Sequence, residues 1–247
     1  MTDDARLAVV PAVVELAARL ATDVDGIYVG GSVATGDYRP GVSDIDAVAL
    51  VAQPPSPSAR GHLVAVHRQL MRDVPGAAAL HCVYVSRRHV DDPRFTHWTW
   101  AFEELFRRTF SGIARAELLA GPVVVRGPAP PTWLPAMSPD ALRAAARAEL
   151  SGYWHTAVRK RAIWDRDVYV DHGLTTVARA DITVEHGRLA TKTEAIAHLA
   201  DLGLPERIRV EVEQRRKGVA VPLTAPQRTE RARTVRRFVR DHIERLT

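Results

Sequence analysis

Hydrophobic residues in the first half of the chain follow both helical and strand-like spacing. A helical period over about residues 4–22 places four apolar side chains on one face: Val9, Val13, Leu16 and Leu20. Short apolar runs bounded by turn residues predict strands at 26–29, 44–51, 79–85 and 123–125, with a helix at about 58–73. This mixture predicts an α+β domain in which a mixed sheet is flanked by helices.

The second half of the chain has helical spacing throughout. The proline-rich segment 128–137 predicts a linker between a domain at 1–127 and a helical bundle at 138–247. Ser138, Pro139 and Asp140 form a helix start, and Thr191 with Glu194 forms a capping box. The expected helices lie at about 139–162, 166–186, from 191 onwards, 205–217 and 225–246.

Composition narrows the class of protein. The single cysteine, Cys82, cannot form an internal disulfide, no apolar run is long enough to cross a bilayer, and the acidic start is unlike a signal peptide. We therefore expect a cytoplasmic protein without a membrane partner. The net charge of +5 favours anionic partners such as phosphates. Because nearly all basic residues are arginine, we give this charge little weight as a sign of nucleic-acid binding, which it does not exclude.

One motif carries candidate chemistry. Gly30, Gly31 and Ser32 follow the strand at 26–29, and Asp44 and Asp46 follow after a short loop. Alternation along a strand places both carboxylates on one face, with Cα atoms about 7 Å apart. Their repulsion favours a divalent cation, and hard oxygen ligands are those that Mg²⁺ takes beside substrate phosphates. The glycine-serine turn brings backbone N–H groups to the same place, so the pattern predicts in-line displacement at phosphorus.

The same residues carry a family resemblance. The segment 30–51, GGSVATGDYRPGVSDIDAVALV, resembles the signature of the DNA polymerase β-like nucleotidyltransferase superfamily. The resemblance implies that the Gly31 backbone and Ser32 contact the phosphates of a nucleoside triphosphate (NTP). It also implies that Asp44 and Asp46 hold Mg²⁺, with two ions usual in the family. Ser43, which opens the second half of the motif, is assigned to nucleotide binding with them.

The helical half resembles one branch of this superfamily. Residues 174–216 are similar to the C-terminal domain of aminoglycoside (3'')(9) adenylyltransferases, in which an arginine and a lysine contact the ATP phosphates. Arg179 and Lys192 occupy the matching positions. The resemblance implies transfer of AMP from ATP, or of another nucleoside monophosphate, to a hydroxyl of an aminoglycoside or aminocyclitol. It does not predict the oligomeric state.

The chain departs from this branch at the expected general base. The strand at 79–85 places His81 where the resembled enzymes have a glutamate. An imidazole can accept the hydroxyl proton near neutral pH, so His81 is one candidate base. Alternatively, His81 only donates a hydrogen bond and Glu103 or Glu104 is the base. A third possibility is a binding protein of this fold whose chemistry has lapsed.

The acceptor site is the least defined part of the prediction. In the resembled enzymes a tryptophan and an aspartate bind the cationic antibiotic, and the nearest candidates here are Trp100, Glu103 and Asp171. Helical spacing would make Trp100 and Glu104 neighbours, and core packing is the other interpretation of this tryptophan. RNA or protein stays open as an alternative acceptor. The basic run 228–245 predicts an amphipathic helix with one solvated face.

Overall fold

The computed structural model describes residues 6, 8 and 10–247, which divide into two compact units, Met1–Met137 and Ser138–Thr247. Val9 of the predicted first helix lies outside the described residues. Within them this helix is α2 (Pro11–Arg19), which buries Val13 and Leu16 as the helical period predicted.

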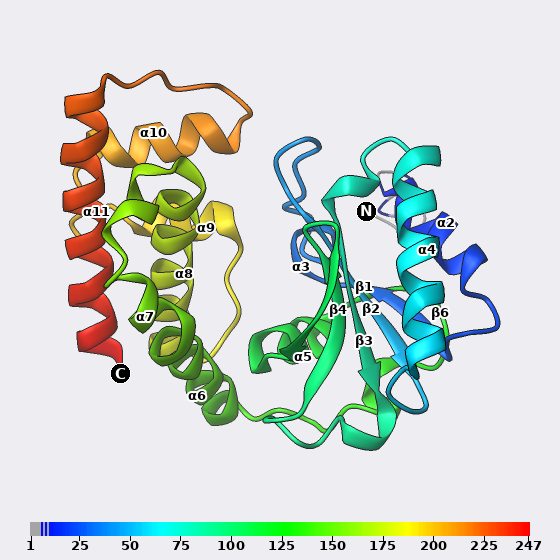
Figure 1. Cartoon of the computed structure of the whole chain (residues 1–247). Helices are drawn as coiled ribbons and strands as arrows, with labels where there is room; N and C mark the ends of the chain where they lie inside the picture. Colours follow the sequence, from blue (N-terminus) through cyan, green and yellow to red (C-terminus); the bar gives the residue numbers. More distant parts are fainter. Residues whose placement is uncertain (1–5, 7, 9) are drawn as a thin grey trace. The chain divides into compact units, whose positions relative to one another are not determined.

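The first unit is built on a six-stranded mixed sheet in the order β5-β4-β3-β2-β1-β6 (Figure 1). The strands are β1 (Gly26–Val29), β2 (Ile45–Val51), β3 (Leu80–Ser86), β4 (Thr96–Ala101), β5 (Glu104–Thr109) and β6 (Val123–Arg126). β2 and β3 are parallel, and every other neighbouring pair is antiparallel. A parallel pair needs a crossover connection, which α4 (Pro57–Asp73) provides.

Helices cover both faces of this sheet (Figure 1). α2 and α4 bury one face, to which β2 contributes Ala47 and Ala49. α5 (Gly112–Ala120) packs on the other face, to which β2 contributes Val48 and Leu50. Because side chains alternate along a strand, Asp46 points to the α5 face, at the end of β2 that the apolar cluster does not cover.

The proline-rich segment expected to be a linker is part of the first unit. It contains the short helix η3 (Pro130–Thr132), after which Trp133 and Leu134 are buried in the cluster on the α5 face. The Tyr28 hydroxyl donates a hydrogen bond of 2.7 Å to the Pro128 carbonyl oxygen. Burial of these apolar side chains fixes a segment whose prolines alone suggested a linker.

The second unit is entirely helical, as predicted, and no helix among the described residues has the length and apolarity to cross a bilayer. Its elements are α6 (Pro139–Glu149), η4 (Leu150–Trp154), α7 (His155–Ala157), η5 (Arg161–Asp165), α8 (Asp167–His186), α9 (Lys192–His198), α10 (Glu206–Arg216) and α11 (Ala225–Leu246). The predicted helix at 139–162 is interrupted by η4, a π-helical turn with non-helical φ and ψ at Gly152. Glycine loses the most conformational freedom in a helix, so the break falls there.

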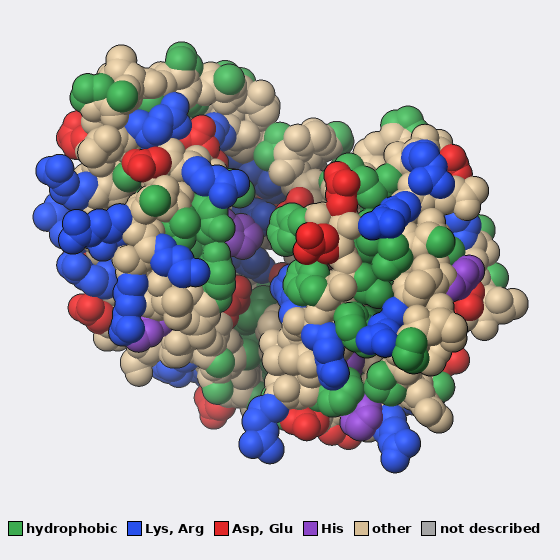
Figure 2. Space-filling view, in the orientation of Figure 1, with side chains coloured by type: hydrophobic (Ala, Val, Ile, Leu, Met, Phe, Trp, Pro, Cys, Tyr) green, Lys and Arg blue, Asp and Glu red, His purple; other side chains and the backbone are tan. Residues whose placement is uncertain are grey.

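The net charge is unevenly divided between the units. Residues 138–247 contain 21 Lys and Arg against 15 Asp and Glu, a net +6, whereas residues 1–137 contain 13 against 14, a net −1. Many Lys and Arg side chains are visible on the surface of the second unit, at left in Figure 2. The second unit therefore carries the attraction for anions that the whole-chain charge indicated.

Two buried histidines in the first unit predict that acid destabilises it. Burial lowers the pKa of His67 to about 3 and that of His97 to about 4, from an ordinary value of 6.5. Unfolding exposes both rings, which then take up protons below pH 6.5 while the folded rings stay neutral. The stability that they provide is therefore complete above pH 6.5 and is lost as the pH falls towards 3 to 4, by about 1.4 kcal/mol per pH unit for each ring.

We expect the free energy of unfolding to fall more steeply between pH 7.5 and 5 in the native protein than in a His67→Phe variant, by about 2 kcal/mol. The phenyl ring keeps the stacking on Trp100, whose centroid lies 4.6 Å from that of His67, but cannot be protonated. Urea unfolding followed by circular dichroism at the two pH values measures the difference. Equal losses in both proteins would contradict the prediction.

Candidate active site

The two motif carboxylates lie at the start of β2. Asp44 directly precedes the strand, Asp46 is its second residue, and both side chains are exposed, while Ile45 between them is buried. The pattern matches the alternation predicted from the sequence. Both carboxylates are therefore presented on the same exposed edge of an otherwise apolar strand.

Gly31 lies directly against the Asp46 carboxylate. Gly31 begins the short helix α3 (Gly31–Ala34) with φ of +54°, in the left-handed region. A Cβ atom built on Gly31 would lie 2.3 Å from Oδ2 of Asp46, closer than any non-bonded contact allows. The Gly30 amide donates a hydrogen bond of 2.8 Å to the Asp46 carbonyl oxygen, which fixes the turn against β2. Both the conformation and the available space at position 31 thus require glycine.

Gly31→Ala is expected to reduce any activity of the site at least about 100-fold, because the new methyl group must displace the Asp46 carboxylate. It should also lower stability by about 1–3 kcal/mol, through the left-handed φ and the clash. Gly30→Ala is the matched control: its Cβ would meet Leu118 Cδ2 at 3.8 Å, an ordinary contact. Melting temperatures and turnover of the two variants measure both effects, and similar behaviour of the pair would contradict this account.

His81 lies beside Asp46 in the sheet. β2 and β3 pair in parallel with Asp46 opposite His81, and Val48 opposite Val83. Residues paired in this way have side chains on the same face, so the imidazole and the carboxylate are neighbours. His81 is half-buried, and its ring lies edge-to-face against the Phe102 ring. The structure thus brings together Gly31, Asp46 and His81, which are far apart in the chain.

A tight turn between β4 and β5 borders His81. Ala101 pairs with Glu104, which leaves Phe102 and Glu103 as a two-residue loop. Both have positive φ, 54° and 64°, and they are the only non-glycine residues with positive φ in the described part of the chain. Glu103 and Glu104 are exposed and near this edge of the sheet, so either carboxylate remains a candidate base.

The two serines of the motif differ in their surroundings. Ser32 is half-buried in α3, and its hydroxyl makes no hydrogen bond to the described residues, so it can donate to a ligand. Ser43 is buried, and its Oγ accepts a hydrogen bond of 3.1 Å from the Arg39 amide. Ser43 therefore holds the loop that leads to Asp44, a local role that its assignment to nucleotide binding did not include.

Trp100 is a core residue, which corrects the expectation that it binds the acceptor. Its side chain is 2% exposed and stacks on His67 at an interplanar angle of 6°. The helical spacing applied to Trp100 and Glu104 was also wrong, because they lie on the antiparallel strands β4 and β5. Strand alternation directs Trp100 into the α2–α4 face of the sheet, away from the face of Asp46.

A hydrogen bond in the second unit links Arg179 to the segment that contains Lys192. Arg179 is on α8, and its Nε donates a hydrogen bond of 2.7 Å to the carbonyl oxygen of Ala190. Lys192, two residues after Ala190, is the first residue of α9 and follows the Thr191 cap. Both side chains are half-buried. The structure thus anchors Arg179 next to the segment that presents Lys192.

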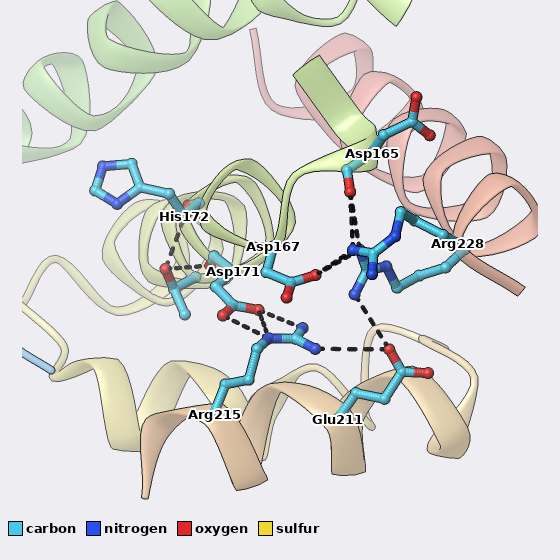
Figure 3. A network of polar contacts seen from close by, with 9 residues as sticks. Asp165, Asp167, Asp171, His172, Glu211, Arg215 and Arg228 are labelled. Atoms are coloured by element: carbon cyan, nitrogen blue, oxygen red, sulfur yellow. Dashed lines mark hydrogen bonds and ion pairs between the residues drawn. The ribbon is translucent and has the colours of Figure 1, made fainter. Parts of the chain in front are cut away.

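Asp171 does not offer a free carboxylate, which corrects its assignment to acceptor binding. The guanidinium of Arg215 on α10 forms a bidentate ion pair with this carboxylate, with Nη2 2.6 Å from Oδ1 and Nε 2.8 Å from Oδ2 (Figure 3). Burial raises the pKa of the Asp171 carboxyl, and the Arg215 guanidinium offsets only part of that effect. The same network contains Asp167, Glu211 and Arg231 and joins α8, α10 and α11.

The two carboxylates at the start of β2 suit a hard cation whose remaining ligands are substrate oxygens. No group of three or more His, Cys, Asp or Glu side chains among the described residues is placed to hold a metal by itself. Asp44 and Asp46 supply two carboxylates on one exposed edge. Mg²⁺ usually takes one or two carboxylates together with phosphate oxygens and water, so this pair fits it.

Phe102 is a candidate site residue that was not predicted from the sequence. Its neighbours were interpreted with a helical period, although Trp98 and Trp100 alternate with polar Thr99 as a half-buried strand does. That alternation was a signal for β4. No sequence pattern predicted a turn at Phe102-Glu103, because such turns normally contain Asn or Gly.

Comparisons with known proteins identify the domain that contains these residues and the fold of the chain. The family model of the nucleotidyltransferase domain matches residues 12–75, which include Gly31, Ser32, Asp44 and Asp46. The fold resembles the crystal structure of spectinomycin adenyltransferase AAD(9) from Enterococcus faecialis, determined with ATP and spectinomycin. The TM-score is 0.70 and the sequence identity 16%, over 95% of this chain and 98% of that one. No curated protein sequence matches the chain. The predicted fold class and the nucleotidyltransferase domain are confirmed.

Proposed function

We propose that this chain, an enzyme whose residues 12–75 match the nucleotidyltransferase domain, transfers a nucleoside monophosphate to a hydroxyl of a small molecule. The donor we propose is ATP, with Mg²⁺ as the metal. The acceptor class is an aminoglycoside or aminocyclitol, because the structurally similar AAD(9) was determined with ATP and spectinomycin. A role in antibiotic resistance is part of the same proposal.

The observation that carries the proposal is the arrangement at the start of β2 and β3. Asp46 lies against Gly31 on one side and beside His81 on the other. The turn that would bind phosphate, the carboxylate that would bind the metal and the imidazole that would accept the proton are therefore contiguous on one edge of the sheet. These are the groups that in-line transfer to a hydroxyl requires.

Asp44 and Asp46 would hold Mg²⁺ together with the NTP phosphates. When bound, the cation neutralises charge on the phosphates and stabilises the departing pyrophosphate. The Ser32 hydroxyl and the Gly31 backbone would contact the phosphates. We propose that Arg179 and Lys192, from the unit with a net charge of +6, pair with the triphosphate.

His81 would act on the acceptor. An imidazole nitrogen would take the proton of the acceptor hydroxyl while the hydroxyl oxygen forms a bond to the α-phosphorus. The bond from the α-phosphorus to the bridging oxygen then breaks, and pyrophosphate leaves. The acceptor oxygen must lie within hydrogen-bond distance of His81, which places the acceptor beside the Phe102-Glu103 turn. Glu103 is the remaining candidate for contact with a cationic acceptor.

Mass spectrometry of reaction mixtures tests this function. The protein is incubated with Mg²⁺, the four NTPs and a panel of aminoglycosides and aminocyclitols that includes spectinomycin, with Asp46→Asn as the control. We expect an acceptor whose mass has increased by one nucleoside monophosphate, formed only by the unsubstituted protein. Competition among the four NTPs identifies the donor in the same spectra.

An absence of product with every acceptor, together with Mg²⁺-dependent NTP binding, would contradict a small-molecule acceptor. The alternatives would then be an RNA or protein acceptor, for which the net +6 charge of the second unit is the favouring observation, or lapsed chemistry. Incubation with α-³²P-labelled NTPs and either total RNA or total cell protein separates these three, because transfer leaves the label on the polynucleotide or on a protein, and lapsed chemistry labels neither.

A further inference from the structure

The turn at Phe102 and Glu103 combines two unfavourable features. Positive φ at both central residues is the backbone of a type I′ hairpin loop, in which Asn or Gly usually occupies these positions. A phenylalanine there has no polar side chain to stabilise the left-handed conformation. Phe102 is also 74% exposed, so burial does not compensate. Backbone outliers of this kind concentrate at functional sites.

Within residues 10–247, the Phe102 ring has one ring partner, the imidazole of His81. The ring centroids lie 4.9 Å apart with an interplanar angle of 61°, an edge-to-face arrangement. Among the described residues, His81 has no hydrogen-bond or ion-pair partner that would fix its ring. Catalytic bases are usually oriented by a third group that holds their second polar atom. No such polar group contacts His81 among the described residues, and the Phe102 ring is the group that lies against its imidazole.

We propose that Phe102 is a positioning residue for His81. The turn holds Phe102 in place, and the Phe102 ring restricts the His81 imidazole. The proposal rests on the proposed function, in which His81 accepts the proton of the acceptor hydroxyl. The turn closes a hairpin whose strands are paired from Thr96 to Thr109, so the ring is attached to a rigid element. A ring contact can restrict the imidazole without neutralising it or occupying its nitrogens, which stay available for the acceptor.

The test compares three variants of the full chain. Phe102→Leu removes the ring and keeps apolar volume, whereas Phe102→Tyr keeps the ring. Phe95→Leu is the matched control, because Phe95 stacks on His89 with centroids 4.0 Å apart, just before β4. Each protein is labelled with ¹⁵N-histidine, and the His81 imidazole resonances are assigned with His81→Gln. kcat and KM for the NTP are measured on the same samples.

We expect Phe102→Leu to shift the His81 resonances and lower kcat by about 10- to 100-fold, with KM for the NTP unchanged. Phe102→Tyr should keep the His81 resonances and kcat close to their native values, and Phe95→Leu should leave them unchanged. Unshifted resonances in Phe102→Leu, or shifted resonances with native kcat, would overturn the proposal. If the unsubstituted protein transfers no nucleotide, the proposed function fails, but ¹⁵N relaxation of the His81 ring still shows whether the imidazole is more mobile in Phe102→Leu than in the native protein.

Discussion

Replacing Asp46 with asparagine is expected to slow nucleotidyl transfer by about 1,000-fold or more without unfolding the protein. The amide has the shape of the carboxylate, and the side chain lies at an exposed position at the start of β2. The substitution removes one of the two charged oxygen ligands that we propose for Mg²⁺. Such a metal contributes several kcal/mol to the transition state, and each 1.36 kcal/mol is tenfold in rate. The measurements are kcat at saturating NTP and Mg²⁺, and the melting temperature.

Asp92→Asn provides the comparison, because Asp92 is an exposed carboxylate of the same unit away from β2. It should retain native activity. Asp46→Asn within tenfold of the native kcat would mean that the carboxylate is not a ligand in the reaction. A large fall in melting temperature would instead assign the loss of activity to the fold.

Replacing His81 with alanine is expected to lower kcat by about 100- to 10,000-fold, the range typical of a general base. NTP binding should persist, because the proposed phosphate contacts come from other residues. His81→Glu, which installs the residue type of the resembled enzymes, should recover part of the rate. Its activity should also extend to lower pH, because a carboxyl releases its proton more readily than an imidazolium does.

Initial rates from pH 5 to 9, with NTP affinity measured by calorimetry, distinguish the alternatives for the base. If His81→Ala keeps a near-native rate while Glu103→Gln or Glu104→Gln abolishes it, the base is the glutamate. If neither His81 nor these glutamates affects the rate, proton transfer is not a significant part of the barrier. The native pH profile sets the reference for each variant.

Sequence alone predicted much of the first unit because its signals are local. β1, β2, β3 and β6 are short apolar runs bounded by turn residues, and Asp44 and Asp46 follow from alternation along β2. In the second unit, α6 and α9 begin at the caps that the sequence predicted, Ser138 and Thr191. Where a residue and its nearest neighbours decide the conformation, pattern and structure agree.

The errors arose where distant residues decide the conformation. Trp100 appeared available for a ligand until its stacking partner His67, 33 positions earlier, was known. Asp171 appeared free because Arg215, 44 positions later, gives no local signal of pairing with it. Trp133 and Leu134 lie in a proline-rich segment, but the sheet that buries them forms from strands much earlier in the chain.

The charged network of the second unit has a consequence for how this half of the chain can change. Three carboxylates and three guanidiniums balance within it: Asp167, Asp171, Glu211, Arg215, Arg228 and Arg231. Arg231 is 1% exposed, so loss of its partners would leave a buried charge uncompensated, at a cost of about 3–5 kcal/mol. In chimeras with relatives, or in laboratory evolution of acceptor preference, these positions should be exchanged as a single block. A graft of α8 without α10 and α11 would separate the charges that hold the three helices together.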